Sequence, residues 1–397
     1  MKKIKRVFLI IIDSLGIGAS ADAASFHDEG ADTLGHISEF ANSLKIDTLV
    51  SLGLSNIHTL KQYPHLQKQV GYAAVLKEAG VSKDTLSGHW EMMGVRCETP
   101  FCSFSETGFP QDLIARLEAL CNHKVIGNKS ASGTKILKEL GEEALRDNAM
   151  IVYTSADSVL QICGHEKYFG LEELYRCCEI AREITMEEKW KVGRVIARPF
   201  IGEDSDHFVR TANRRDYALN PPMNTDLDDL KQNKLDVIGI GKIHDIFSGC
   251  GITKSLHSES SVDGMKQTID MAQEDFTGLC FTNLVDFDAK WGHRRDVNGY
   301  ARELEMFDML LKELVNLLKE DDLLMISADH GNDPTFRGSD HTRENVPLLI
   351  YNPKIGEGKV LEPQVSFGCI GATILDIFGI QRDVKRVGTS FLDKIEE

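Results

Sequence analysis

The sequence has no apolar run long enough to cross a membrane. The long run near its start, VFLIII at 7–12, has six residues, whereas a helix that spans a bilayer needs about 20. Asp13 follows this run at once, and the small-residue pattern of a secretory cleavage site is missing. We therefore expect a cytoplasmic protein with no membrane partner.

The sequence also lacks a C-x-x-C pair, although it holds nine cysteines. They are scattered, and the one adjacent pair, Cys177 and Cys178, falls within an expected helix. Disulfide frameworks and thiolate zinc sites use regular cysteine spacings, so this usage suits reduced and mostly buried thiols. Neither a disulfide framework nor a thiolate zinc site is expected.

Positive charge is scarce, with 45 Lys and Arg against 61 Asp and Glu and a net charge of -16. Because nucleic acid binding needs clustered Lys and Arg on one surface, we expect no nucleic acid partner. A small phosphorylated substrate stays compatible with this charge if metal ions or a local group of arginines reverse the potential around it. Protein partners are not predicted.

Short apolar runs rich in β-forming residues alternate with amphipathic stretches of helical length, which is typical of an α/β sheet. The 397 residues are enough for two or three domains. The expected strands are 7–11, 150–155, 236–241, 279–285, 323–328 and 347–351, and the expected helices are 110–121, 171–184, 262–274, 298–319 and 371–378.

The middle of the chain differs in composition from its two ends. From about 99 to 222 it is richer in Cys, Arg and mixed polar segments, and it closes with YALNPPMNT, whose proline pair suits a domain boundary. We expect a core built from 1–99 and 221–397, interrupted by a second domain at 100–220. Surface loops accept such insertions at low cost.

Acidic and imidazole side chains follow three of the expected strands. In an open α/β sheet, ligands bind outside the carboxyl ends of the strands, so residues distant in sequence can converge there. Carboxylates and imidazoles together suit Mn²⁺ or Zn²⁺, and two such cations can neutralise the oxygens of a transferring phosphoryl group. The candidates are Asp13, Asp286, Asp288, His293, Asp329, His330 and, in the loop that follows, His341.

Each of these residues also has a structural interpretation. An Asp after a strand often caps a helix, and a single His is often a hydrogen-bonded packing residue. Caps explain DHGND at 329–333 poorly, because Asp and His stand side by side there and His341 follows. Asp286 and Asp288 lie two apart, so both face one side on a strand but only one need ligate on a turn. Their spacing leaves both open.

A group of basic residues lies in and just beyond the middle segment. Arginine forks match phosphate oxygens with two hydrogen bonds, which makes this group a candidate phosphate site. The alternative is a solvated basic face. The residues are Arg194, Arg198, Arg210, Arg214, Arg215 and Lys242.

The segment SKDTLSGHWEMM at 82–93 has no apolar period in its first half. It predicts a loop that enters a short helix at 89–93. Loops carry function more often than cores do, so the hydroxyls and the imidazole of this loop are candidates for a reactive group. Thr85, Ser87 and His89 cannot be ranked on this basis.

Five motifs in order along the chain resemble those of the bacterial phosphopentomutases, a family of the alkaline phosphatase superfamily. They are DSLGIG (13–18), KDTLSGHWEMMG (83–94), GRVIARPF (193–200), VDFDAKWGHRRD (285–296) and ADHGNDPTFRGSDHTRE (328–344). The resemblance implies an α/β core with a central, mostly parallel sheet between helices and an inserted α+β cap domain. It also implies reversible conversion of ribose 1-phosphate to ribose 5-phosphate, and of the deoxyribose pair, through a phosphothreonine.

The resemblance implies a role for particular residues. Two Mn²⁺ ions are expected, and Thr85 is expected to carry the phosphate, first supplied by glucose 1,6-bisphosphate or ribose 1,5-bisphosphate. Leu86, Ser87 and the spacer 289–292 depart from the common family pattern without changing a proposed ligand. The expected ligands are Asp13, Asp329 and His330 for one ion and Asp288, His293 and His341 for the other, and the expected sugar-phosphate contacts are Asp157, Arg194, Arg210 and Lys242.

Two other functions remain open at this point. A phosphoglycerate mutase-like enzyme or a phosphatase of the same superfamily would share the metal ligands but act on another substrate. A metal-dependent phosphosugar sensor would bind ribose 5-phosphate without turning it over, and Thr85 would then serve only as a ligand contact.

Overall fold

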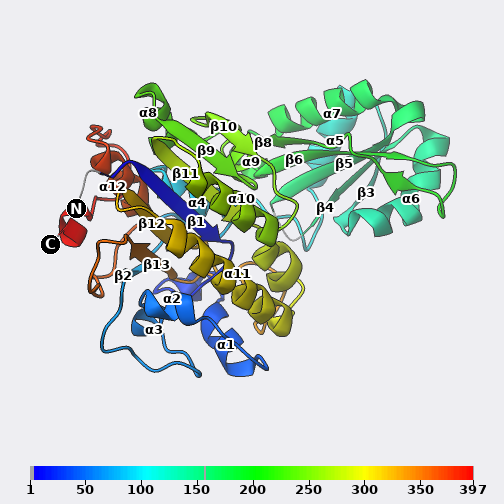
Figure 1. The fold of residues 1–397 in the computed structure, drawn as a ribbon. Coiled ribbons are helices and arrows are strands. Elements are labelled where there is room, and N and C mark those ends of the chain that lie inside the picture. Colours follow the sequence, from blue (N-terminus) through cyan, green and yellow to red (C-terminus); the bar gives the residue numbers. More distant parts are fainter. Residues whose placement is uncertain (1–3, 156–157, 397) are drawn as a thin grey trace. The chain divides into compact units, whose positions relative to one another are not determined.

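The computed structural model describes residues 4–155 and 158–396, and the chain divides into two compact units (Figure 1). The first unit consists of Met1–Thr99 and Asn220–Glu397, and the second of Pro100–Leu219. Asp157, one of the expected substrate contacts, lies outside the described residues.

The first unit is built on a seven-stranded sheet in the order β10-β9-β11-β1-β12-β13-β2. Its strands from β10 to β12 run parallel to one another, whereas β13 is antiparallel to both of its neighbours. All five strands expected in this unit are confirmed, and the short β2 and β10 were not expected. The bounds are β1 Arg6–Ile12, β2 Tyr72–Leu76, β9 Asp236–Ile240, β10 Lys254–Leu256, β11 Gly278–Leu284, β12 Asp322–Ser327 and β13 Val346–Tyr351.

The central strands are mostly apolar, as expected where both faces of a sheet are covered. All seven residues of β1 are buried, and α10 and α11 cover the face that is in front in Figure 1. The helices of this unit are α1 Thr33–Phe40, α2 Asp47–Ser51, α3 Leu54–Ile57, α4 Thr85–Met92, α8 Asp226–Gln232, α9 Ile243–Ile246, α10 Ser261–Gln273, α11 Val297–Leu317, α12 Cys369–Ile377 and α13 Leu392–Glu396.

The second unit has its own sheet, in the order β3-β4-β5-β6-β7 with β8 paired to β6. Successive side chains of a strand point to opposite faces, and here Met150 and Val152 join one apolar cluster while Ile151 and Tyr153 join another. Helices therefore cover both faces. The bounds are β3 Val125–Ser130, β4 Met150–Thr154, β5 Val159–His165, β6 Arg194–Ile201, β7 Val209–Arg210, β8 Arg215–Ala218, α5 Gln111–Cys121, α6 Gly133–Asp147 and α7 Leu171–Ile184.

The start of α4 differs from expectation. The helix expected at 89–93 begins four residues earlier, at Thr85. The carboxylate of Asp84 accepts hydrogen bonds from the amides of Leu86 (3.0 Å) and Ser87 (3.1 Å), and the hydroxyl of Ser87 lies 3.4 Å from the amide of Asp84. This reciprocal cap fixes the first residue of α4, which apolar periodicity in the sequence does not reveal.

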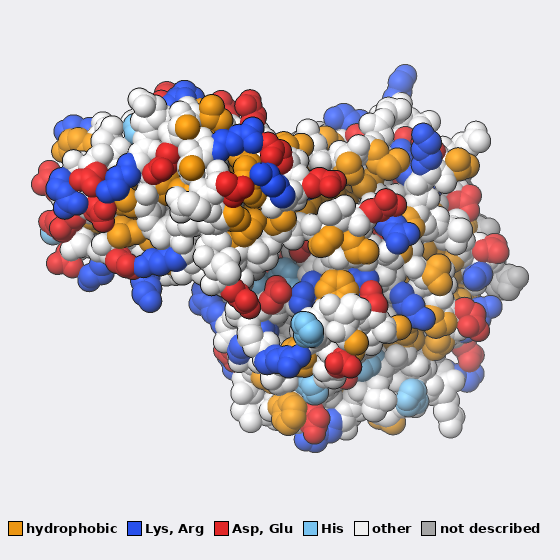
Figure 2. Space-filling model, turned by 180° about the vertical axis from the view of Figure 1, so that it is seen from behind, with side chains coloured by type: hydrophobic (Ala, Val, Ile, Leu, Met, Phe, Trp, Pro, Cys, Tyr) orange, Lys and Arg blue, Asp and Glu red, His pale blue; other side chains and the backbone are white. Residues whose placement is uncertain are grey.

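The remaining features concern the thiols and the surface. All nine cysteines are free thiols, and seven of them are buried. Within 4–155 and 158–396, no helix combines the length and apolar character needed to span a bilayer. Acidic and basic side chains are intermingled on the faces of the two units that Figure 2 shows.

Candidate metal centre and nucleophile

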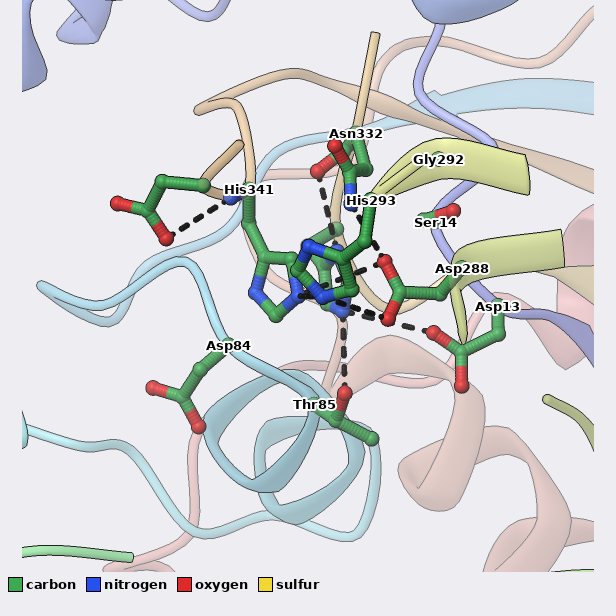
Figure 3. Close-up of polar contacts among 12 residues, drawn as sticks. Asp13, Ser14, Asp84, Thr85, Asp288, Gly292, His293, Asn332 and His341 are labelled. Carbon is green, nitrogen blue, oxygen red and sulfur yellow. Dashed lines mark hydrogen bonds and ion pairs between the residues drawn. The ribbon is translucent and has the colours of Figure 1, made fainter. Parts of the chain in front are cut away.

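The carboxyl ends of three adjacent strands bring the candidate ligands together. Ile12, the last residue of β1, is paired with Leu284 of β11, and Ile11 is paired with Ser327 of β12. Asp13 follows β1 directly, Asp329 lies two residues beyond β12, and Asp288 lies in the π-helical turn Phe287–Gly292 after β11. The side chains at these ends therefore meet at one edge of the sheet (Figure 3).

The first ligand group consists of Asp13, Asp329 and His330, whose ligand atoms all lie within 4.8 Å of one another. His330 Nε2 is 3.5 Å from Asp13 Oδ1 and 3.3 Å from Asp329 Oδ2. All three residues are at most 2% exposed, and these two carboxylate oxygens have no hydrogen-bond partner in the described structure. Buried and unpaired oxygens of this kind suit a bound cation.

The pKa shifts in this group follow from burial and close charges. Burial, together with the carboxylates of Asp329 and Asp288, raises the pKa of Asp13 well above its usual range. Burial also acts to raise the pKa of Asp329, but His330 and His89 outweigh it and lower that pKa. Burial lowers the pKa of His330 to about 4, so its imidazole is neutral at pH 7 and can donate a lone pair.

The second ligand group consists of Asp288, His293 and His341. His293 Nε2 is 3.1 Å from Asp288 Oδ2 and 3.1 Å from His341 Nε2, which itself lies 3.4 Å from Asp288 Oδ1. Nδ1 of His293 donates to the Ser339 carbonyl (2.7 Å), and Nδ1 of His341 donates to the Lys83 carbonyl (3.0 Å). These bonds leave both Nε2 atoms directed toward Asp288, as metal-ligating histidines require.

The two groups adjoin through His330. Its ring stacks on that of His341 with the centroids 3.9 Å apart, and Asp288, His330 and His341 also have ligand atoms within 4.8 Å of one another. Burial acts to raise the pKa of Asp288, but the imidazoles of His293 and His341 hold it well below its usual range.

The structure separates Asp286 from Asp288. The Asp286 carboxylate accepts a hydrogen bond from the amide of Ser261 (3.0 Å) and pairs with Lys290 Nζ (2.9 Å). Asp288 instead accepts from Asn332 Nδ2 (2.7 Å) and faces the histidines. The π-helical turn thus directs one of the two carboxylates into the group, an alternative that spacing left open.

Thr85 lies beside both groups. It is the first residue of α4, its side chain is partly exposed, and its Oγ1 is 3.1 Å from His330 Nε2 (Figure 3). Ser87 is occupied in the helix cap, where its hydroxyl donates to the Asp84 carbonyl (2.9 Å). His89 is fully buried. Of these three candidates, Thr85 alone presents an accessible hydroxyl to the ligand groups.

Sequence analysis missed several residues that support the site. Asn283 Nδ2 donates to Asp13 Oδ2 (3.0 Å) and lies 3.3 Å from His89 Nε2. Its signal was an amide within the apolar strand β11. Arg343 is 2% exposed and donates to the Gly80 carbonyl (2.7 Å), to the Ser82 carbonyl and to Glu78, so it anchors the segment that leads to Thr85.

The expected sugar-phosphate contacts belong to different units. Arg194 on β6 lies 3.8 Å from Asp216 Oδ2, and Arg210 on β7 is exposed. Lys242 immediately precedes α9 in the first unit, and its charge acts to lower the pKa of Asp13 against the larger effects of burial and the neighbouring carboxylates. Both arginines belong to the second unit.

A third group of possible metal ligands, His123, Glu173 and Cys177, lies in the second unit. Arg176 Nε donates to Glu173 Oε2 (2.8 Å), and His123 Nε2 is 2.9 Å from Glu173 Oε1. The hydrogen bonds from Arg176, and then from His123, lower the pKa of Glu173 to about 2. These ion pairs explain the arrangement without a metal.

Comparison with known proteins assigns the family. Residues 5–382 match the metalloenzyme superfamily. The phosphopentomutases of Clostridium beijerinckii and Agathobacter rectalis are each 55% identical over 395 residues, and that of Clostridium tetani is 55% identical over 397, with 100% of both chains covered. The chain belongs to the phosphopentomutase family. The family and the ligand groups together indicate metal binding, and the expected α/β fold class is confirmed.

Solved structures show more distant likeness. A protein of Pyrococcus horikoshii is 13% identical with a TM-score of 0.49, covering 96% of this chain and 99% of that one. A phosphoglycerate mutase of Leishmania mexicana is 10% identical with a TM-score of 0.48, covering 97% of each chain. Neither likeness bears on the chemistry of the phosphopentomutase site.

Proposed function

We propose that this chain interconverts α-D-ribose 1-phosphate and D-ribose 5-phosphate, and the corresponding 2-deoxyribose phosphates, through a phosphothreonine at Thr85. One observation carries the proposal: Thr85 Oγ1 lies 3.1 Å from His330 Nε2, where the two ligand groups adjoin. Relatives named phosphopentomutase, 55% identical over the full chain, supply the substrate class. The substrate is then a small phosphorylated sugar.

The two ligand groups are proposed to hold two Mn²⁺ ions. Asp13, Asp329 and His330 would bind one, and the fit is supported by their unpaired carboxylate oxygens. The other ligands would be Asp288, His293 and His341. Mixed carboxylate and imidazole donors suit Mn²⁺. When bound, the ions supply positive charge that neutralises phosphoryl oxygens and favours ionisation of the Thr85 hydroxyl.

The reaction begins with Thr85 phosphorylated by glucose 1,6-bisphosphate or ribose 1,5-bisphosphate. The C1 hydroxyl of ribose 5-phosphate attacks the phosphorus, the bond from phosphorus to Thr85 Oγ1 breaks, and the hydroxyl proton ends on Thr85. The resulting 1,5-bisphosphate reorients. Thr85 then attacks the C5 phosphorus and loses its proton to the departing C5 oxygen, which releases ribose 1-phosphate and restores the phosphothreonine.

Asp157, Arg194, Arg210 and Lys242 are proposed to contact the sugar phosphate. An acidic chain needs the local positive charge of the two arginines and the lysine to hold an anion. Support comes from the second unit, where Arg210 Nη1 lies 3.0 Å from the position that a Cβ on Gly133 would take, at the first residue of α6. The positive end of a helix and a guanidinium together favour a phosphate.

Mass analysis tests the nucleophile. After incubation with glucose 1,6-bisphosphate and Mn²⁺, intact and peptide masses should show one phosphate on Thr85. Thr85→Ala should carry none and should not turn over ribose 5-phosphate, whereas the matched Ser87→Ala variant should still be phosphorylated. A phosphate on Ser87, or on no residue, would overturn the proposal. Turnover of 3-phosphoglycerate without turnover of ribose 5-phosphate would favour a phosphoglycerate mutase instead.

A further inference from the structure

His89 is fully buried beside the site, yet the mechanism above leaves it without a role. Its Nδ1 is 2.9 Å from the carbonyl oxygen of Thr85 and 3.3 Å from Asp329 Oδ2. Its Nε2 is 3.3 Å from Asn283 Nδ2, which donates to Asp13 Oδ2 (3.0 Å). One ring therefore contacts the nucleophile's main chain and, directly or through one amide, both carboxylates of the first ligand group.

The neighbours of His89 determine where its proton lies. A carbonyl oxygen only accepts hydrogen bonds, so Nδ1 carries the proton and donates to Thr85. Asn283 presents its amide nitrogen to the carboxylate of Asp13, so the same nitrogen donates to His89 Nε2, which accepts. Nδ1 is therefore a hydrogen-bond donor and Nε2 a hydrogen-bond acceptor.

The helix that carries His89 is packed tightly against the first ligand group. A Cβ on Gly88 would lie 2.2 Å from the carbonyl oxygen of Asp329, so only glycine permits this approach. The ring of His89 stacks on Phe281 of β11, with the centroids 5.8 Å apart and an interplanar angle of 28°. These contacts hold α4 against β11 and against the residue Asp329 that follows β12.

We propose that His89 is a positioning residue that sets the Thr85 hydroxyl against the carboxylates of the first ligand group. It acts through Nδ1, which donates to the Thr85 carbonyl and lies 3.3 Å from Asp329 Oδ2, and through Asn283, which orients Asp13. The inference rests on the proposed function, because Thr85 phosphorylation is the step it serves. His89 contacts the main chain of Thr85 and not its reacting hydroxyl.

Three substitutions of His89 distinguish the contribution of Nδ1 from that of Nε2. His89→Asn keeps an amide donor close to the Nδ1 position, His89→Gln moves the amide toward the Nε2 position, and His89→Phe keeps only the ring packing. The Gln and Phe variants should lose about 10-fold or more in kcat and need about 10-fold more Mn²⁺ for half-saturation, as loss of a partner to a metal ligand does. The Asn variant, which keeps a donor near the Nδ1 position but loses the Nε2 acceptor, should lose less than the Phe variant, and KM for ribose 5-phosphate should change little.

Mn²⁺ binding measured by calorimetry supplies a readout that does not depend on activity. A merely structural role would lower thermal stability but leave kcat and Mn²⁺ affinity intact in the folded variants. Wild-type kcat and Mn²⁺ affinity in the Gln and Phe variants would overturn the inference, and so would equal impairment of the Asn and Phe variants. Absence of ribose 5-phosphate turnover by the wild type would overturn the proposed function instead, while the comparison of Mn²⁺ affinities would still decide the role of His89.

Asn283→Ala provides a second route if the histidine variants do not fold. It removes the donor shared by His89 Nε2 and Asp13 Oδ2 while leaving the ring in place. Mn²⁺ affinity should fall by about 10-fold. Unchanged Mn²⁺ affinity and kcat in this variant would overturn the inference.

Discussion

The two ligand groups of the first unit differ in how many carboxylates and imidazoles they contain. The first places two carboxylates, Asp13 and Asp329, at the ends of β1 and β12 with one neutral imidazole. The second places a single carboxylate, Asp288, between the imidazoles of His293 and His341. The first group therefore concentrates negative charge in a buried place, whereas the second balances its charge internally.

The difference shows in the pKa shifts. The pKa of Asp13 is raised, first by burial and then by the neighbouring carboxylates, so its ionisation at neutral pH opposes folding in the metal-free protein. The pKa of Asp288 is lowered because its histidines outweigh the effect of burial, so its ionisation favours folding. A bound cation would therefore stabilise the first group more than the second, in which Asp288 already pairs with two imidazoles.

The largest effect is expected from Asp13→Asn. Loss of a carboxylate proposed to bind Mn²⁺ should lower kcat/KM by roughly 1,000-fold. The chelated variant should nevertheless unfold at a higher temperature than chelated wild type at neutral pH, because Asn carries no group whose raised pKa opposes folding. Calorimetric unfolding with a chelator measures this. Asp286→Asn, whose side chain bonds Ser261 and Lys290 outside both groups, is the matched control and should keep most of the activity.

Asp288→Asn sharpens the comparison. Activity should again fall, by roughly 100-fold, because the proposed second ion loses its carboxylate. The chelated variant should unfold at a lower temperature than chelated wild type, opposite to Asp13→Asn, because His293 and His341 lose the charge that pairs with them. A stability change of the same sign in both variants would contradict the distinction between the groups.

The sequence predicted the sheet of the first unit well, for a physical reason. Strands buried on both faces, such as β1 and β12, are continuous apolar runs that are hard to mistake. The short β2 and β10 lie at the two edges of the sheet and carry too few residues to show a pattern. In the second unit, Arg198 and Pro199 interrupt the apolar character of β6 and obscure that strand.

The site was predictable only in part. Acids and imidazoles after strands indicated where ligands would gather, because the ends of parallel strands share an edge. The choice between Asp286 and Asp288 depends on a π-helical turn, and the choice between Thr85 and Ser87 depends on a helix cap. The contact of His89 with Asp329 depends on how α4 packs against the segment that follows β12, and spacing along the chain does not encode such tertiary contacts.

Acid should destabilise the metal-free protein through His330, which adjoins both ligand groups. Its pKa in the folded, metal-free protein is about 4 against an ordinary 6.5, so the unfolded chain takes up a proton first as the pH falls. Stability is therefore lost between pH 6.5 and about 4, by an amount of the order of 3 kcal/mol at most. Urea unfolding of chelated His330→Asn should show a flatter pH dependence across this range. His257→Asn, whose side chain is 79% exposed, should leave the wild-type dependence unchanged.

The smallest effects should come from two glycines, one beside each group. A Cβ on Gly88 would lie 2.2 Å from the main-chain oxygen of Asp329, which cannot move without moving the ligand. A Cβ on Gly292 would lie 2.9 Å from the side-chain amide of Asn332, which donates to Asp288 but can shift more readily than a main-chain group. Gly88→Ala should therefore cost about 1–3 kcal/mol of unfolding free energy and about 10-fold in kcat, and Gly292→Ala less than about 1 kcal/mol.

Urea unfolding and steady-state kinetics of both glycine variants decide the point, with Gly356→Ala as the control because no heavy atom lies within 4 Å of its Cβ position. The control should change the unfolding free energy by no more than about 0.5 kcal/mol. Equal costs at Gly88 and Gly292 would mean that the first group adjusts as readily as the second. The main chain of Asp329 would then not be the fixed reference against which α4 positions Thr85.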